Sequence, residues 1–323
     1  MKHLTHICIT LIGIILLYCC GNSSSSSTSD SKQTRKLNSI YHWKTTFNLN
    51  STETDFLHKH NIKRIYLRMF DVAIEENHLT GEIDIVPIAT TKFISSIPDN
   101  IEIVPVAYIT IDALRAMAGS EVTYANLITE RLLAMASYNA CGTIKEIQLD
   151  CDWTSSTKKN YDRLCHVVKN SLEQKNIDLS VTVRLHQLHE SAPIANKGVL
   201  MLYNTGALKN PKTLNSILDI NDAKPYIKPT HYRIPLDYAY PTFGWGVKFR
   251  NGQFVSIVPF NDDNITNQES IRYERALSGD IQHIKGLIEK AIGKPSAGNI
   301  IYHLDHSQLK YYSDDEISQI YTY

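Results

Sequence analysis

From residue 39 onward, segments with strand character alternate with segments with helix character, and this alternation constrains the fold more than any other feature. Short apolar runs rich in Val, Ile and Tyr predict strands, whereas apolar residues spaced three or four apart predict helices. The predicted strands are 39–47, 63–72, 101–111, 146–154, 177–188, 198–205, 231–241 and 299–305. The predicted helical segments are 53–60, 88–97, 124–138, 160–175, 214–223 and 280–292.

Eight strands interleaved with helices predict an α/β fold, a (β/α)8 TIM-like barrel formed by residues 38–323. No glycine-rich phosphate loop follows the first strand, which disfavours a doubly wound sheet and gives no reason to expect a cofactor. Residues 243–259 interrupt the pattern with two alternating runs around Asn251-Gly252. Asn-Gly between such runs is a strong hairpin signal, so we expect a β-hairpin insertion near strand seven.

The fourth predicted strand carries the residues most suggestive of chemistry. Gln148, Asp150 and Asp152 alternate with apolar neighbours, so these polar side chains share one face of the strand. A barrel strand is buried on both faces, and buried carboxylates must be paired, hydrogen-bonded or functional. Asp150 and Asp152 are therefore the candidate catalytic residues.

The fifth strand shows the same alternation, with Arg184 and His186 on its polar side. Barrel enzymes place their sites at the carboxyl ends of the strands. We therefore expect Arg184 and His186 to meet the acidic pair there, although Asp150 and Arg184 could instead form a buried ion pair. The further candidates at strand ends are Trp43, Asp71, Tyr203, Asn204, Asp305 and His306.

Histidine spacing does not predict a metal site. His186 and His189 fit no helical pair or short metal-binding pattern, and His303, Asp305 and His306 are typical of residues that collect at strand ends. The formal net charge is zero and there is no long basic run, so nucleic acid is not an expected partner.

The N-terminus is predicted to be a signal segment. Lys2 precedes an apolar run, residues 7–18, which is short for a membrane span and ends at Cys19-Cys20-Gly21. This arrangement resembles a bacterial lipoprotein signal, with residues 1–20 as the signal and Cys20 as the lipidated residue; an ordinary secretory signal is the alternative. Residues 21–37 are Ser-rich and predict a disordered tether. We expect a lipid-anchored protein of the bacterial cell envelope, at the outer membrane, with no other membrane contact.

Two short runs resemble those of the chitinase-type (family 18) glycoside hydrolases. Asp150-Cys-Asp152-Trp-Thr154 is similar to the Asp-x-Asp-x-Glu run at the end of their fourth strand, and Met201-Leu-Tyr203-Asn204 is similar to the Met-x-Tyr-Asp/Asn run of their sixth. The chain also resembles uncharacterised barrel lipoproteins of Bacteroides-type bacteria. The resemblance implies a TIM barrel that acts on a glycan, with Tyr203 and Asn204 positioning the substrate.

The sequence departs from this family where the acid should be. The family's Glu protonates the leaving oxygen, and Thr154 stands in its place. A hydroxyl has no pKa near neutrality, so Thr154 cannot supply that proton. Asp152 could take the acid role with Asp150 tuning it, or Asp71, Asp237 or Asp305 could supply the proton. Alternatively, the barrel binds a glycan without cleaving it.

Two functions therefore remain open. The first is a surface-anchored glycoside hydrolase that uses Asp150 and Asp152. The second is a carbohydrate-binding lipoprotein in which Trp43, Trp153 and Trp245 offer stacking surfaces. Trp245 and Tyr240 could equally pack the predicted hairpin.

Overall fold

The computed structural model describes residues 36–261, 266 and 268–323. The predicted signal segment, Cys20 and nearly all of the predicted tether lie outside the described residues. Lys36 and Leu37, the last two residues of that tether, are described, and they are held against the loop before the last barrel strand. Leu37 donates a backbone hydrogen bond to the carbonyl of Ala297 at 2.8 Å. Among the described helices, none is long and apolar enough to cross a membrane.

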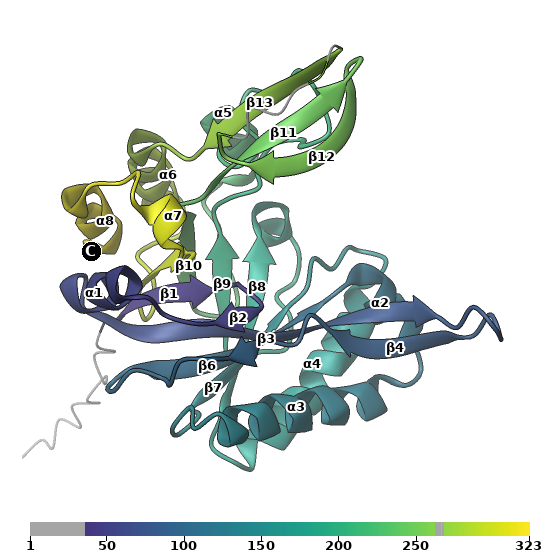
Figure 1. Cartoon of the computed structure of the whole chain (residues 1–323). Coiled ribbons are helices and arrows are strands. Elements are labelled where there is room, and N and C mark those ends of the chain that lie inside the picture. Colours follow the sequence, from purple (N-terminus) through teal and green to yellow (C-terminus); the bar gives the residue numbers. More distant parts are fainter. Residues whose placement is uncertain (1–35, 262–265, 267) are drawn as a thin grey trace, which may run out of the picture. The chain divides into compact units, whose positions relative to one another are not determined.

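Eight parallel strands close into a barrel, which confirms the predicted fold (Figure 1). Strand β1 hydrogen-bonds to both β14 and β3, so the sheet has no gap. The barrel strands are β1 (Asn38–His42), β3 (Ile62–Glu76), β6 (Glu102–Ile109), β7 (Glu146–Asp150), β8 (Asp178–Arg184), β9 (Lys197–Met201), β10 (Leu236–Pro241) and β14 (Asn299–Tyr302).

Helices follow most of the barrel strands, and α4 shows why they form. Its buried residues Tyr161, Leu164, Val168 and Leu172 recur at helical spacing and pack toward the sheet. The α-helices are α1 (Ser51–Lys59), α2 (Ile111–Ala116), α3 (Glu121–Tyr138), α4 (Lys158–Glu173), α5 (Ile220–Ala223), α6 (Ser278–Ala291), α7 (His306–Leu309) and α8 (Asp314–Tyr321). Two short 3₁₀ helices are η1 (Leu185–His189) and η2 (Lys224–Tyr226).

One predicted helix is wrong and another is only partly right. Residues 88–97 form no helix; they hold the end of β4 (Ile83–Ile88) and the short β5 (Lys92–Phe93), which pairs with β2 (Thr46–Phe47). Strand β4 pairs antiparallel with the extended end of β3. Within 214–223 only α5 (Ile220–Ala223) is helical. The side chain of Asn215 accepts hydrogen bonds from the backbone N–H groups of Ile217 and Leu218, which stabilises a turn in place of a helix.

The predicted hairpin is present and belongs to a larger insertion. Strands β11 (Gly244–Arg250) and β12 (Gln253–Pro259) flank Asn251-Gly252, and both turn residues have positive φ, as a two-residue type I′ turn requires. A third strand that we did not predict, β13 (Glu269–Arg275), pairs with β11 on its other side. This three-stranded sheet lies between β10 and α6 in the chain (Figure 1).

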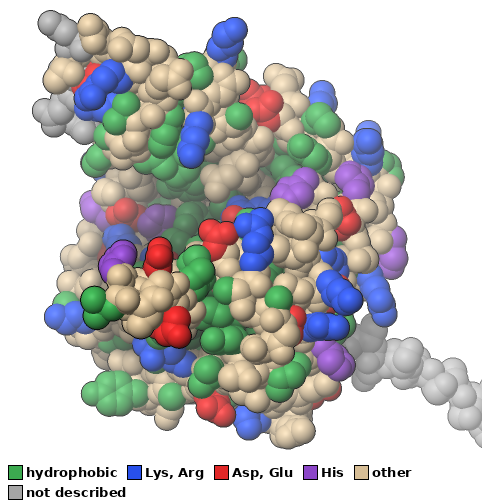
Figure 2. Space-filling model, turned by 90° about the vertical axis from the view of Figure 1, so that its right-hand side faces the viewer, with side chains coloured by type: hydrophobic (Ala, Val, Ile, Leu, Met, Phe, Trp, Pro, Cys, Tyr) green, Lys and Arg blue, Asp and Glu red, His purple; other side chains and the backbone are tan. Residues whose placement is uncertain are grey.

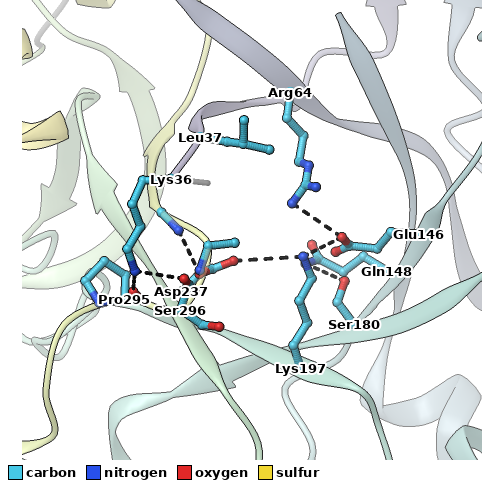
Figure 3. Close-up of polar contacts among 12 residues, drawn as sticks. Lys36, Leu37, Arg64, Glu146, Gln148, Ser180, Lys197, Asp237, Pro295 and Ser296 are labelled. Carbon is cyan, nitrogen blue, oxygen red and sulfur yellow. Dashed lines mark hydrogen bonds and ion pairs between the residues drawn. The ribbon is translucent and has the colours of Figure 1, made fainter. Parts of the chain in front are cut away.

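The inside of the barrel is polar and layered. At the amino ends of the strands, Glu146 forms ion pairs with Lys197 at 2.5 Å and with Arg64 at 3.5 Å, and Asp237 accepts hydrogen bonds from the backbone of Ala297 and Gly298 (Figure 3). Above this layer, Tyr41 donates to Gln148 at 2.7 Å and Gln148 donates to Ser180 at 3.3 Å. These layers fill the barrel, so a ligand can enter only at the carboxyl ends of the strands.

Gly298 lies at the base of the barrel, where the surrounding atoms leave no room for a larger side chain. A Cβ added there would overlap the carbonyl oxygen of Leu37 and lie 2.8 Å from the hydroxyl of Tyr323, whereas a Cβ at Gly286 in α6 meets nothing within 4 Å. Gly298→Ala should therefore destabilise the fold by roughly 1–3 kcal/mol through overpacking. Gly286→Ala should stabilise it by about 1 kcal/mol through helix propensity.

Chemical denaturation of the two variants and the parent protein measures both effects. Equal stability of the Gly298→Ala variant and the parent would contradict the close approach of Leu37 to the barrel base.

Candidate functional site

The carboxyl ends of the barrel strands surround a cavity of about 570 Å³. It opens on a face of the molecule that is visibly hollowed, with acidic, basic and histidine side chains at the rim (Figure 2). Its lining residues come from six barrel strands, β3, β6, β7, β8, β9 and β14, from the segments that follow the barrel strands, and from the insertion. They are Trp43, Arg68, Asp71, Tyr108, Asp150, Asp152, Arg184, Met201, Tyr203, Asn204, Phe243, Gly244, Trp245, Tyr302, His303, Asp305 and Gln308.

Asp150 is the last residue of β7 and lies on the inner wall of this cavity with only 2% of its surface exposed. The hydroxyl of Thr182 on β8 donates to one of its oxygens at 2.6 Å. Burial raises the pKa of Asp150 to about 6, since desolvation and the nearby Asp152 outweigh the opposing effects of Arg184 and Thr182. The structure thus places a carboxyl that titrates just below neutrality at the centre of the site.

Asp152 is ion-paired with Arg184, the last residue of β8. The Nε of Arg184 donates to Asp152 Oδ1, and the guanidinium carbon lies 5.9 Å from the centre of the Tyr203 ring. Burial opposes the charge on Arg184, but Asp152 and Asp150 outweigh it and raise its pKa above the usual value. Its Nη1 is buried and has no hydrogen-bond partner among the described residues. One donor of this guanidinium is therefore left over beside the cavity.

A second arginine–aspartate pair lies on the β3 side of the cavity, and sequence reasoning missed it. Arg68 bonds to both carboxylate oxygens of Asp71, donates to the carbonyl of Trp43 at 3.2 Å and lies 5.7 Å from the Trp43 ring. Simple alternation puts positions 68 and 71 on opposite faces of a strand. A bulge between Arg68 and Phe70 changes the phase, so both side chains reach the cavity.

The third carboxylate at the rim, Asp305, also has a cation beside it. Lys44 lies 3.2 Å from Asp305 and 3.0 Å from Glu53. Burial opposes ionisation of Asp305, but Lys44 and the hydroxyl of Ser307 outweigh it and lower its pKa. Asp71, Asp152 and Asp305 thus each have a basic partner, whereas the bonded neighbour of Asp150 is a hydroxyl.

Aromatic rings form a continuous belt across the cavity. Tyr302 at the end of β14 is its centre, with ring centroids 5.7 Å from Trp43, 4.9 Å from Tyr203 and 5.5 Å from Phe243. The belt continues from Phe243 to Trp245 at 5.1 Å. The Trp245 indole N–H donates to Glu274 at 2.9 Å, which fixes the ring on the insertion sheet. The structure therefore brings together the predicted residues Trp43, Tyr203, Asn204 and Trp245 with Asp150, Asp152 and Arg184.

Trp153 does not join them, contrary to the expected stacking surface. It is 1% exposed, stacks on Tyr161 of α4 at 6.4 Å and lies outside the cavity lining. The same alternation that turns Asp150 and Asp152 inward turns Trp153 outward, onto the apolar face with Leu149. Tyr240 is also fully buried away from the cavity.

Thr154, at the position of the family's acid, is exposed and does not line the cavity. Strand β7 ends at Asp150, and the backbone N–H of Thr154 donates to Thr157 at 2.9 Å in the turn that leads into α4. Asp237, considered as another proton donor, lies at the opposite end of the barrel, where it is bonded to the Ala297 and Gly298 amides. Neither residue can act in the cavity.

His186 lies on η1 and not on a strand, and it is exposed. It lines a smaller hollow of about 300 Å³ that shares Asp152, Arg184, Tyr203 and Asn204 with the main cavity. His189 contacts the carbonyl of Tyr226 at 3.1 Å. Among the described residues, no group of three or more His, Cys, Asp or Glu is arranged to hold a metal ion.

Comparison with solved structures finds the same barrel in chitinases. The chitinase ChiB of family GH18 from the chitin utilization locus of Flavobacterium johnsoniae matches with a TM-score of 0.54 and 11% identity, over 90% of this chain and 94% of that one. A chitinase from Chromobacterium violaceum matches with a TM-score of 0.53 and 10% identity, over 88% and 97%. This chain has the (β/α)8 TIM-like barrel fold that these chitinases share. No protein-family model matches the sequence, and no curated protein matches it.

The raised pKa of Asp150 makes a prediction about stability. Between about pH 4 and pH 6 the folded protein keeps a proton on Asp150 that the unfolded chain has released, so ionisation of this residue destabilises the fold as the pH rises through that window. Asp150→Asn, which can still accept the Thr182 hydrogen bond, should stabilise the protein at pH 7 by an amount on the order of 3 kcal/mol.

Denaturation of the variant and the parent at pH 4 and pH 7 measures this effect, and the difference between them should shrink at pH 4. A variant less stable than the parent at pH 7 would show that Asp150 is ionised in the fold without cost.

Proposed function

We propose that this cavity binds a glycan and does not hydrolyse it. The observation that carries the proposal is the combination of an aromatic belt with carboxylates that are already paired. Trp43, Tyr302, Phe243 and Trp245 give apolar ring faces at the mouth of a barrel, on which sugar rings can stack. Hydroxyls of the sugar find donors and acceptors in the two arginine–aspartate pairs beside the belt.

The absence of an acid at the position of Thr154 favours binding over cleavage. Thr154 is exposed and does not line the cavity, Asp71 and Asp152 are held in ion pairs by Arg68 and Arg184, and Lys44 helps to lower the pKa of Asp305. The acid role that the sequence suggested for Asp152 is therefore disfavoured. The chitinases of similar fold are the reason to expect an oligosaccharide and not another small molecule.

Hydrolysis is the second candidate, and Asp150 is the observation in its favour. A buried carboxyl with a pKa of about 6 is partly protonated near neutrality and lies in the cavity wall, as a general acid should. In this case Asp150 would donate the proton, and the Asp152–Arg184 pair would orient the substrate.

Calorimetric titration with β-linked amino-sugar and plant oligosaccharides, together with mass spectrometry of the same mixtures, separates the two functions. We expect binding without new reducing ends. Trp43→Ala should weaken binding at least tenfold, about 1.4 kcal/mol, because it removes one end of the belt. Tyr138→Ala, which changes an aromatic residue that is 90% exposed and outside the cavity, is the matched control.

Equal affinities of the Trp43→Ala and Tyr138→Ala variants would overturn the cavity as the glycan site. Release of product by the parent, abolished in Asp150→Asn, would establish the hydrolase in its place.

We further propose that the protein is a lipoprotein of a bacterial envelope, anchored through Cys20. The support is the sequence of the signal region, with Cys20 preceded by a small residue and followed by a Ser-rich stretch. In cells fed labelled palmitate, the parent should carry the label and sediment with membranes. Cys20→Ser should lose both properties, whereas Cys19→Ser should keep them. Labelling of the Cys20→Ser protein would refute the assignment.

A further inference from the structure

We infer that the glycan taken by this cavity carries a free amino group, and that its ammonium ion pairs with Asp150 among tyrosine rings at the base of the cavity. This inference rests on the proposed function of the cavity as a glycan site, to which it adds the chemical class of the sugar.

The balance of charge around the cavity is the first argument. Arg68 is paired with Asp71 and Arg184 with Asp152, whereas Asp305 shares Lys44 with Glu53. Asp150 remains: its one hydrogen bond with a described residue comes from the neutral hydroxyl of Thr182 to Oδ1. Its Oδ2 accepts no hydrogen bond from the described residues, although the side chain is 2% exposed and lines the cavity. The nearby Arg184 lowers the pKa of Asp150 but forms no ion pair with it. A nearly buried carboxylate that no cation contacts is costly, and a ligand cation would offset that cost.

The surroundings of Asp150 are the second argument. The rings of Tyr108, Tyr203 and Tyr302 line the cavity with it, and the charge of Asp150 acts on the hydroxyl of each. Tyr203 and Tyr302 have ring centroids 4.9 Å apart, and the Tyr203 hydroxyl is buried without a partner among the described residues. Ring faces beside a carboxylate attract an ammonium ion through cation–π and ionic interactions together. The free Tyr203 oxygen can accept one of its N–H bonds.

The other cations in the cavity do not oppose such a ligand. The guanidinium of Arg184 is the positive group nearest to this region, and its charge is balanced by Asp152. With both pairs counted, the region carries one net negative charge when Asp150 is ionised, and one ammonium ion brings it to zero. An N-acetylated sugar is neutral and would cover Asp150 without pairing it, and an acidic sugar would be repelled.

Titration calorimetry of the whole protein with glucosamine oligomers and with N-acetylglucosamine oligomers of equal length tests the inference. At about pH 6.5 most of Asp150 is ionised, and a carboxylate beside a bound amine favours the protonated form of that amine. We expect the parent to bind the glucosamine oligomer at least tenfold more tightly. Asp150→Asn should reduce this preference to less than twofold, whereas Asp112→Asn, which removes an exposed carboxylate of α2, should leave it unchanged.

The outcomes separate this inference from the function on which it rests. Binding of the acetylated oligomer as tight as that of the free amine, or a preference that persists in Asp150→Asn, would overturn the inference and leave the glycan site in place. Binding of none of the glycans would overturn the proposed function itself. The comparison of the two oligomers in the parent stands without any variant, so it decides the matter even if Asp150→Asn fails to fold.

Discussion

The site depends on the closure of the sheet by β1, which hydrogen-bonds to β14 on one side and to β3 on the other. Closure fixes the register of all eight strands and brings their carboxyl ends into one ring. Asp150, Arg184 and Tyr302, which end three different strands, meet around one cavity for this reason. The polar layers below them hold that register, because the buried Glu146 must remain in contact with its half-buried partners Lys197 and Arg64.

Strand periodicity predicted most of the barrel. The eight strands lie where alternation and β-branched residues indicated them, because strands that are buried in a barrel carry a strong pattern. The helix predicted at 88–97 is wrong because tertiary pairing decides this segment: the amides of Thr91 and Lys92 bond to Met69 and Thr45. Strand β13 was missed because it is an edge strand of the insertion sheet. Its position depends on pairing with β11, and that pairing forms only in the folded chain.

The residues of the candidate site were predictable wherever their side chains follow the alternation of their strand. Asp150 and Asp152 face inward as alternation requires, and Tyr203 and Trp43 follow strand ends. Arg68 was missed as a site residue because its pairing with Asp71 depends on a bulge that leaves no clear mark in the sequence. Trp153 was assigned a binding role from its residue type although its own alternation placed it with Leu149. The partners in ion pairs such as Asp152–Arg184 cannot be assigned from the sequence, since two strands can bring many charged residues near each other.

The electrostatics of the cavity set it apart from a simple acid–base site. Asp71, Asp152 and Asp305 are paired with Arg68, Arg184 and Lys44, whereas burial raises the pKa of Asp150 to about 6. The cavity therefore contains one carboxyl whose charge a ligand can change. In such a site, stacking on the aromatic belt and the ionisation of Asp150 both contribute to the free energy of ligand binding.

A crystal structure of the protein with a bound oligosaccharide tests the central claim most directly. We predict a sugar ring stacked on the belt between Trp43 and Trp245, with a polar atom within hydrogen-bonding distance of Asp150. A saturated complex in which the sugar lies elsewhere and the cavity at the strand ends holds none would contradict the account.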